Sequence, residues 1–154
     1  MSFWLLKTEP STFGIDDLER ARRKTSAWDG VRNFQARNML RDRMKRGDQG
    51  FLYHSSCAEP GIVGIVKVVK EGYPDPTAFD PRDAHYDPAS RRDEPRWFMV
   101  DVMLERRLSR VITLPELREH ARGALRGMIL LRPGNRLSVM PVEAAHWKFI
   151  LSLE

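Results

Sequence analysis

Apolar and polar residues alternate along the chain with two different periods, which predict strands and helices. A period of two indicates a strand with one buried face, and it occurs at Phe98, Val100, Val102 and Leu104. Apolar residues spaced three or four apart indicate a helix, and they occur at Ala36, Met39, Leu40 and Met44. The second pattern predicts a helix over Asn33–Arg46, with Gly47 in the position after its end that glycine favours.

The other apolar segments predict the remaining elements. We expect strands over Phe3–Lys7, Gln49–Ser55, Gly61–Lys70 and Arg136–Val142. We expect helices over Ile15–Arg23, Leu114–Ala121 and Glu143–Leu151, the last with Ala144, Trp147 and Leu151 facing inward. Residues 72–96 are rich in proline and predict a long loop, a kind of segment that often carries function.

The order of these elements predicts the fold class. Strands outnumber helices and do not alternate strictly with them, which favours an α+β fold with a small curved sheet or barrel. The chain has 154 residues, the size of one ordinary domain, and shows no internal repeat, low-complexity segment or linker. We therefore expect a single domain over residues 1–154.

Composition and charge narrow the choice of partner only slightly. Hydrophobic residues make up 42% and charged residues 31%, a normal globular balance. The net charge of +5 favours acidic partners, with nucleic acid first. A GC-rich genome would give the same excess of arginine, so charge alone does not separate the two explanations.

The sequence also predicts the cellular compartment of the protein. Cys57 is the single cysteine, so no internal disulfide is available, and a reducing compartment is the simple reading. The apolar run Phe3–Leu6 is too short for a signal sequence, and no segment approaches the ~20 apolar residues of a membrane helix. We expect a cytoplasmic protein, nucleoid-associated if bacterial, with no membrane partner.

Residue patterns that carry catalysis or bind metal are weak in this chain. The four histidines lack metal-ligand spacing. His54 and Cys57 lie three residues apart, as a base and a thiol would, but no third orienting group is evident and an inert thiol is the better reading. The acids of the proline-rich loop do not follow a calcium-loop pattern. We therefore expect no catalytic residues, no metal and no cofactor.

Polar and aromatic residues gather instead at the predicted ends of elements. The four groups are Lys7–Pro10, Trp28–Asn33, Tyr53–Ser56 and Ser138–Pro141. Aromatic rings stack on a flat heterocycle, and short polar side chains form hydrogen bonds with its edge. The alternative is that Trp28 and Tyr53 belong to the core and the other residues form turns, and the pattern alone supports this alternative at least as well.

At these groups the chain strongly resembles the EVE domain family. The resemblance rests on WLLKTEP from Trp4, WDGVRNFQARNMLR from Trp28, YHS from Tyr53, GIVGIVKVVKEGYPDPTAF from Gly61 and SVMPV from Ser138. These motifs run nearly end to end, in order. The resemblance implies a PUA-like fold, in which a small mixed sheet closes into a pseudo-barrel surrounded by helices. It also implies kinship with ASCH and YTH domains, which bind RNA or modified bases.

The resemblance further implies a pocket that holds a modified base, such as a modified cytosine, flipped from DNA. Trp28 would form a wall of this pocket. The other implied pocket residues are Lys7, Thr8, Glu9, Arg32, Asn33, Tyr53, His54, Ser55, Ser56 and Ser138. Two positions depart from the family pattern, because Ser56 stands where Asn is common and Met140 where Gln is common. Both changes remove an amide that could pair with a base edge.

The basic residues Arg37, Arg41 and Lys45 recur every four positions, and we expect them to contact phosphates. A DNA-binding reader of a modified base is the favoured function. An RNA-binding PUA-like module is one alternative, which a preference for RNA would reveal. An enzyme acting on the base is the other, and would need an acid or base such as Glu9 or Asp29.

Overall fold

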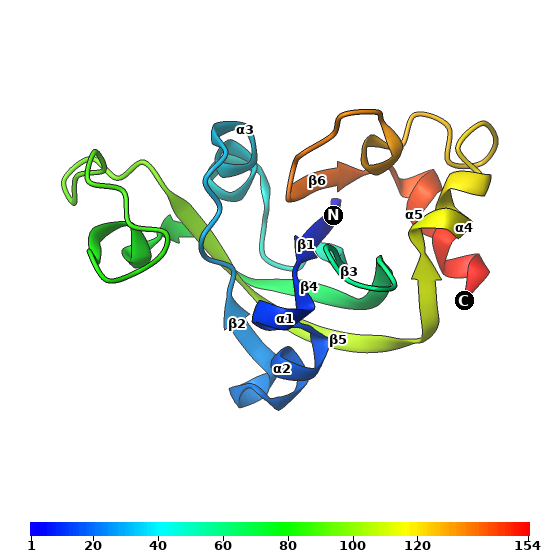
Figure 1. The fold of residues 1–154 in the computed structure, drawn as a ribbon, viewed down its shortest axis with the longest axis horizontal. Coiled ribbons are helices and arrows are strands. Elements are labelled where there is room, and N and C mark those ends of the chain that lie inside the picture. Colours follow the sequence, from blue (N-terminus) through cyan, green and yellow to red (C-terminus); the bar gives the residue numbers. More distant parts are fainter.

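One six-stranded sheet runs through the computed structural model, which describes residues 1–154 (Figure 1). The strands are β1 (Phe3–Thr8), β2 (Thr25–Ala27), β3 (Gln49–His54), β4 (Gly61–Pro74), β5 (Phe98–Thr113) and β6 (Val139–Val142). Their order across the sheet is β2-β5-β4-β3-β1-β6. The pair β1 and β3 is parallel and every other pair is antiparallel.

Short helices cover the sheet and connect its strands. The α-helices are α1 (Pro10–Phe13), α2 (Ile15–Arg20), α3 (Phe34–Asn38), α4 (Leu114–Glu119) and α5 (Ala144–Leu153). Single turns of tighter or wider helix are η1 (Arg22–Lys24), η2 (Met39–Arg43), η3 (Pro76–Phe79) and η4 (Ile129–Leu131). This mixture confirms the α+β class expected from the sequence.

The two longest strands give the sheet its curvature. The pairing of β4 with β5 changes register at four places, the first between Ile62 and Gly64. Each such bulge bends a strand and increases its twist. Figure 1 shows β4 and β5 sweeping beneath β1 and β3, with the end of β5 turning up toward α4. The curved sheet therefore wraps around one of its own faces.

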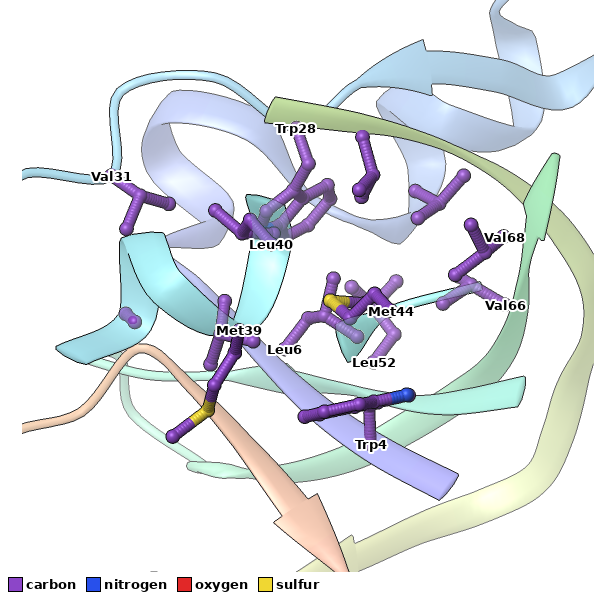
Figure 2. Packing of buried hydrophobic residues seen from close by; sticks show 14 of the residues in the cluster. Trp4, Leu6, Trp28, Val31, Met39, Leu40, Met44, Leu52, Val66 and Val68 are labelled. Atoms are coloured by element: carbon purple, nitrogen blue, oxygen red, sulfur yellow. The ribbon is translucent and has the colours of Figure 1, made fainter. Parts of the chain in front are cut away.

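Each face of the sheet carries its own hydrophobic core, and β1 contributes side chains to both cores. Leu6 belongs to the first core, whose labelled members pack together in Figure 2. Leu5 points to the other face and joins a second core with Trp147 and Ile150 of α5. This alternation follows from the two-residue period of a strand. Both faces of β1 are thus buried, and this burial fixes the position of the polar residues Lys7 and Thr8 at its end.

The helix predicted over Asn33–Arg46 is shorter in the structure. Asn33 begins it as predicted, because its side chain accepts a hydrogen bond from the Ala36 amide at 2.9 Å. The helix then widens in η2, where the Met44 amide reaches back five residues to Met39. The backbone of η2 packs against Gly72 of β4, so closely that a Cβ on Gly72 would lie 2.6 Å from the Leu40 carbonyl oxygen. Packing against the sheet therefore accompanies the early end of the helix.

Other boundaries also differ from the predictions. The helix expected over Ile15–Arg23 ends at Arg20, and left-handed residues at 23 and 24 turn the chain into β2, which was not predicted. The strand beginning at Phe98 continues to Thr113. Ala144 is exposed rather than inward, because the buried side of α5 is formed by His146, Trp147 and Ile150.

Candidate nucleic-acid interface

An open cleft of about 650 Å³ lies beside the end of β1. Six residues expected in a base pocket line it: Lys7, Thr8, Glu9, Trp28, Arg32 and Ser138. Its wall also contains residues that were not assigned to the pocket, among them Phe13, Ser26, Asp29, Gly30 and His85. We call this space the Trp28 cleft. Its volume falls within the ~300–1,000 Å³ of small-molecule sites.

Backbone pairing brings three separate segments together at the end of β1. The Lys7 amide donates to the Ser138 carbonyl oxygen at 2.8 Å, which places the start of β6 beside β1. The Ser55 amide donates to the Thr8 carbonyl oxygen at 2.9 Å, which holds the end of β3 on the other side. The Thr8 hydroxyl donates to the Phe13 carbonyl oxygen and anchors α1. The sheet order therefore assembles one side of the cleft.

Trp28 forms part of the opposite side. Its amide donates to the Val100 carbonyl oxygen at 2.7 Å, which continues the pairing of β2 with β5. The indole ring packs in the first core (Figure 2), edge-on to Phe13, and only 7% of the residue is exposed. Its ring N–H donates no hydrogen bond to the protein. Trp28 therefore belongs to the first core and also lines the cleft.

The buried carboxylate of Asp75 holds the segment after Trp28. It accepts hydrogen bonds from the Gly30 amide at 2.8 Å and from the Thr77 amide and hydroxyl at 2.9 and 2.6 Å. Its other partner is Arg32, 3.1 Å away. Burial opposes ionisation of Asp75, but the hydrogen bonds outweigh it and lower its pKa. An ionised group therefore fixes the cleft wall from behind.

Arg32 is committed to the same wall. Its guanidinium also donates twice to the His85 carbonyl oxygen, at 3.0 and 2.8 Å, and lies 5.3 Å from the Trp97 ring centre. Gly30 lies directly under the His85 ring and has a φ of +77°. A Cβ on Gly30 would lie 2.7 Å from that ring. His85, from the predicted long loop over residues 72–96, thus contributes to one side of the cleft.

Charged groups of both signs face the cleft. Partial burial raises the pKa of Asp29, and the nearby Asp75 carboxylate raises it further. Burial lowers the pKa of Lys7. Glu9 adds a second carboxylate at the exposed rim. Two carboxylates near one ammonium make the cleft better suited to an uncharged polar ligand than to a phosphate.

Five residues of the expected pocket do not line the Trp28 cleft. Asn33 caps α3, and the Ser55 hydroxyl lies 3.4 Å from the Thr8 carbonyl oxygen. His54 accepts a hydrogen bond from the Ile15 amide through Nε2 at 3.1 Å, and burial lowers its pKa. Tyr53 faces a different cleft. Ser56 is exposed, in a left-handed conformation with φ of 52°.

Two features singled out in the sequence have structural roles outside the cleft. The Nε2 atom of His54 is already occupied by the Ile15 amide, so it is not available as a base toward Cys57. Met140 is fully buried in the second core, with its sulfur 3.8 Å from the side-chain nitrogen Nδ2 of Asn135. No three His, Cys, Asp or Glu side chains group closely enough to hold a metal ion.

The three expected phosphate contacts all have partners within the protein. Arg37 donates to the Arg96 carbonyl oxygen, and Arg41 pairs with Asp42 at 2.8 Å. Lys45 lies 4.0 Å from Glu71, beyond the end of the helix, so the three cations do not share one helical face as the sequence suggested.

Comparison with known proteins identifies the family. The EVE domain profile matches residues 2–153. Thymocyte nuclear protein 1 of Danio rerio is 48% identical, over 99% of this chain and 72% of that protein. The structure of the human THYN1 protein in complex with 5-methylcytosine containing DNA is 45% identical, with a TM-score of 0.95 over 99% of this chain and 97% of that one.

A bacterial structure, from Pseudomonas syringae, is also 45% identical, with a TM-score of 0.92 over 99% of each chain. No helix of this chain has the length and apolar content required to cross a membrane. The matches cover the sheet, both cores and every segment around the Trp28 cleft. The chain therefore belongs to the EVE domain family, with the PUA-like fold that its motifs implied.

Proposed function

We propose that this chain binds DNA and holds one flipped, modified base, a modified cytosine, in the Trp28 cleft. The observation that carries the proposal is the cleft itself, where an indole, two carboxylates and an ammonium meet at the end of β1. The likeness to the human THYN1 protein, which was crystallised with 5-methylcytosine containing DNA, supports the same ligand class.

The polar groups of the cleft match the edge of cytosine. The exocyclic amino group of cytosine is a donor that aspartate and glutamate accept, and Asp29 and Glu9 offer such carboxylates. The base also carries acceptors at its ring nitrogen and carbonyl oxygen. Lys7 and Ser138 supply donors for them from the side of β1. Trp28 adds apolar contact and its unpaired ring N–H.

A methyl group on the base would add little binding energy. Burying one methyl contributes about 1 kcal/mol, which is roughly a fivefold change in affinity. Extruding a base costs a few kcal/mol, which the contacts in the cleft must offset. We therefore expect measurable binding to unmodified DNA and a modest preference for the modified base.

The remaining residues implied by the family resemblance act indirectly in this proposal. Asn33 holds the start of α3, and His54 and Ser55 hold α2 and the end of β1. Arg32 holds the wall against Asp75. Tyr53 and Ser56 do not line the Trp28 cleft, so in this proposal they are neighbours of the bound base and do not contact it.

Arg37, Arg41 and Lys45 remain the proposed contacts to backbone phosphates. Arg41 and Lys45 would exchange exposed carboxylate partners for phosphate. Exposed ion pairs contribute only ~0–1 kcal/mol, so this exchange costs little. Such contacts would set affinity without reading the base.

Titration of tryptophan fluorescence with matched duplexes tests the proposal. The duplexes carry cytosine or 5-methylcytosine at one position, and an RNA of the same sequence forms a third arm. We expect the tightest binding to the modified DNA. Glu9→Gln and Ser138→Ala should weaken binding to both DNA duplexes, because the two bases share the edge that these residues contact, whereas Glu59→Gln, an exposed change outside the cleft, should leave affinity unchanged.

Trp28→Ala is the strongest test of the pocket, with Trp28→Phe as the milder change that spares the core. Binding by Trp28→Ala as tight as that of the parent would refute the pocket. Tighter binding to RNA than to DNA would favour the RNA-binding alternative instead. Equal affinity for modified and unmodified DNA would remove the modified base from the proposal.

A further inference from the structure

A second cleft of about 350 Å³ opens on the other side of Lys7. Its walls come from the ends of β1 and β3, from α4 and from the loop that follows η4. Its polar groups are those of Lys7, Tyr53, Arg118, Arg132 and Asn135. No acidic side chain lines it. We call it the Arg118 cleft.

Four of the five polar side chains that line the Arg118 cleft have no partner in the protein. Neither the Lys7 ammonium nor the Tyr53 hydroxyl takes part in a hydrogen bond or an ion pair within the protein, and the same holds for the guanidinium groups of Arg118 and Arg132. Arg118 and Arg132 are exposed residues, and neither the Lys7 ammonium nor the Tyr53 hydroxyl is sealed from solvent. Four residues that line one small space therefore carry donors without an acceptor in the protein.

Three arginines at the surface of β5 each have a carboxylate partner, unlike those of the Arg118 cleft. On β5, Arg106 pairs with Glu154 at 2.8 Å, Arg107 with Asp16 at 2.7 Å and Arg110 with Glu116 at 2.7 Å. These arginines are as exposed as many surface residues, yet the fold supplies each with a carboxylate. The Arg118 cleft lacks one, and it differs in this respect from the Trp28 cleft, which contains Glu9 and Asp29.

Two of the four donors are held in place by burial. Tyr53 is only 3% exposed, and burial raises its pKa, so its hydroxyl stays protonated and able to donate. The Lys7 ammonium lies 5.8 Å from the Tyr53 ring centre. Parallel pairing places Lys7 directly opposite Tyr53 on neighbouring strands. Partly desolvated donors that have no protein partner gain most from a bound acceptor.

We propose that the Arg118 cleft binds a backbone phosphate of the nucleic acid whose base occupies the Trp28 cleft. Lys7 lines both clefts and would lie between the base and the phosphate. Arginine forms paired hydrogen bonds with phosphate oxygens, and the tyrosine hydroxyl adds a neutral donor. The inference rests on the proposed function, because the phosphate belongs to the strand that carries the flipped base.

Salt dependence of DNA binding tests this assignment. Each phosphate contact contributes about 0.9 to the slope of log affinity against log salt. We expect Arg118→Gln and Arg132→Gln each to lower the slope by up to about one and to weaken modified and unmodified duplexes by the same factor. Arg122→Gln is the matched control, because Arg122 is an exposed, unpaired arginine that does not line the cleft.

Two further variants separate charge from folding. Arg118→Lys keeps the charge and should keep the slope of log affinity against log salt. Tyr53→Phe should weaken binding but should leave that slope unchanged. A double variant, Arg118→Gln with Arg132→Gln, that retains the parent slope would overturn the proposal. So would a loss no larger than that of Arg122→Gln.

Neutral methylphosphonates placed one at a time in the strand identify the phosphate. A methylphosphonate at one position near the modified base should strongly weaken binding by the parent. It should weaken binding by the double variant only slightly, because the neutral phosphonate and the double substitution remove the same contact. If every position weakens both proteins equally, the phosphate site is wrong. Preference for 5-methylcytosine reports the proposed function separately, since it should survive in the double variant.

Discussion

The guanidinium of Arg32 lies 3.1 Å from the carboxylate of Asp75, measured from Nη1 to Oδ2, and this pair joins segments 43 residues apart. The Asp75 side chain is fully buried and that of Arg32 is 21% exposed. The pair connects the segment before α3 to the loop that follows β4. It is the principal link between the two parts of the Trp28 cleft wall, and its loss should be felt both in stability and in binding.

Asp75→Ala should lower the free energy of unfolding by about 3–5 kcal/mol. Removing one member of a buried pair leaves the other charge and its neighbouring donors without partners. The donors left behind here are Arg32, the Gly30 amide, and the amide and hydroxyl of Thr77. Urea unfolding measures the loss. Asp80→Ala is the control, since the Asp80–Arg82 pair is exposed and should contribute less than ~1 kcal/mol.

Asp75 should also make the protein sensitive to acid. Its pKa is lowered in the folded state, so the stabilisation is present above the unfolded pKa of ~4 and is lost as pH falls through the lower folded value. The parent should lose stability more steeply than Asp75→Asn as pH is lowered from 5, which is about one unit above the unfolded pKa. Parallel slopes for the two proteins would contradict the assignment.

Gly30→Ala should destabilise the protein and distort the cleft. The left-handed φ of +77° costs an L-residue about 1–2 kcal/mol, and the new Cβ would meet the His85 ring at 2.7 Å. Gly134→Ala isolates the first effect, because its φ is +74° and nothing lies within 4 Å of the new Cβ. Thermal unfolding should show the larger loss for Gly30→Ala, and His85→Ala should relieve the excess.

Asp29 should give base binding a dependence on pH. Partial burial and the Asp75 carboxylate raise the pKa of Asp29, so Asp29 loses its charge at a higher pH than an ordinary aspartate does. If the ionised form accepts the amino group of cytosine, affinity for modified DNA should decline as pH falls toward that pKa. Asp29→Asn should bind more weakly at pH 7 and show a flatter profile. A parent profile as flat as that of Asp29→Asn would remove Asp29 from base recognition.

Local patterns in the sequence were sufficient for the elements with strong periodicity. The predicted strands at Phe3, Gln49 and Gly61 begin where the structure has them, because alternating or continuous apolar residues fix which faces are buried. β2 was missed because three residues carry no periodic signal, and it is a strand only because β5 pairs with it. The Asn33 cap depends on neighbouring residues, so the sequence predicts the start of the helix. Its end accompanies packing against Gly72, which is distant in the sequence, so the end was not predicted.

The candidate site divides in the same way. The motifs that identify the EVE domain family contain Lys7, Trp28 and Ser138, and the sequence alone named them as pocket residues. His85 had no signal of its own, because it reaches the cleft only through Arg32 and Asp75 at long sequence separation. Arg118 and Arg132 look like ordinary surface cations in the sequence, and only the fold shows that no carboxylate reaches them.

By itself, then, the sequence determined the family, the α+β class, the strands whose two faces are buried and the ends of strands at which polar groups collect. These features follow from side-chain period and from residues adjacent in the chain. Tertiary structure decided which polar groups share a cleft, which charges are already paired and which helices end early. Many of those outcomes depend on contacts between residues far apart in the chain, as between Arg32 and Asp75, and no local pattern encodes such contacts.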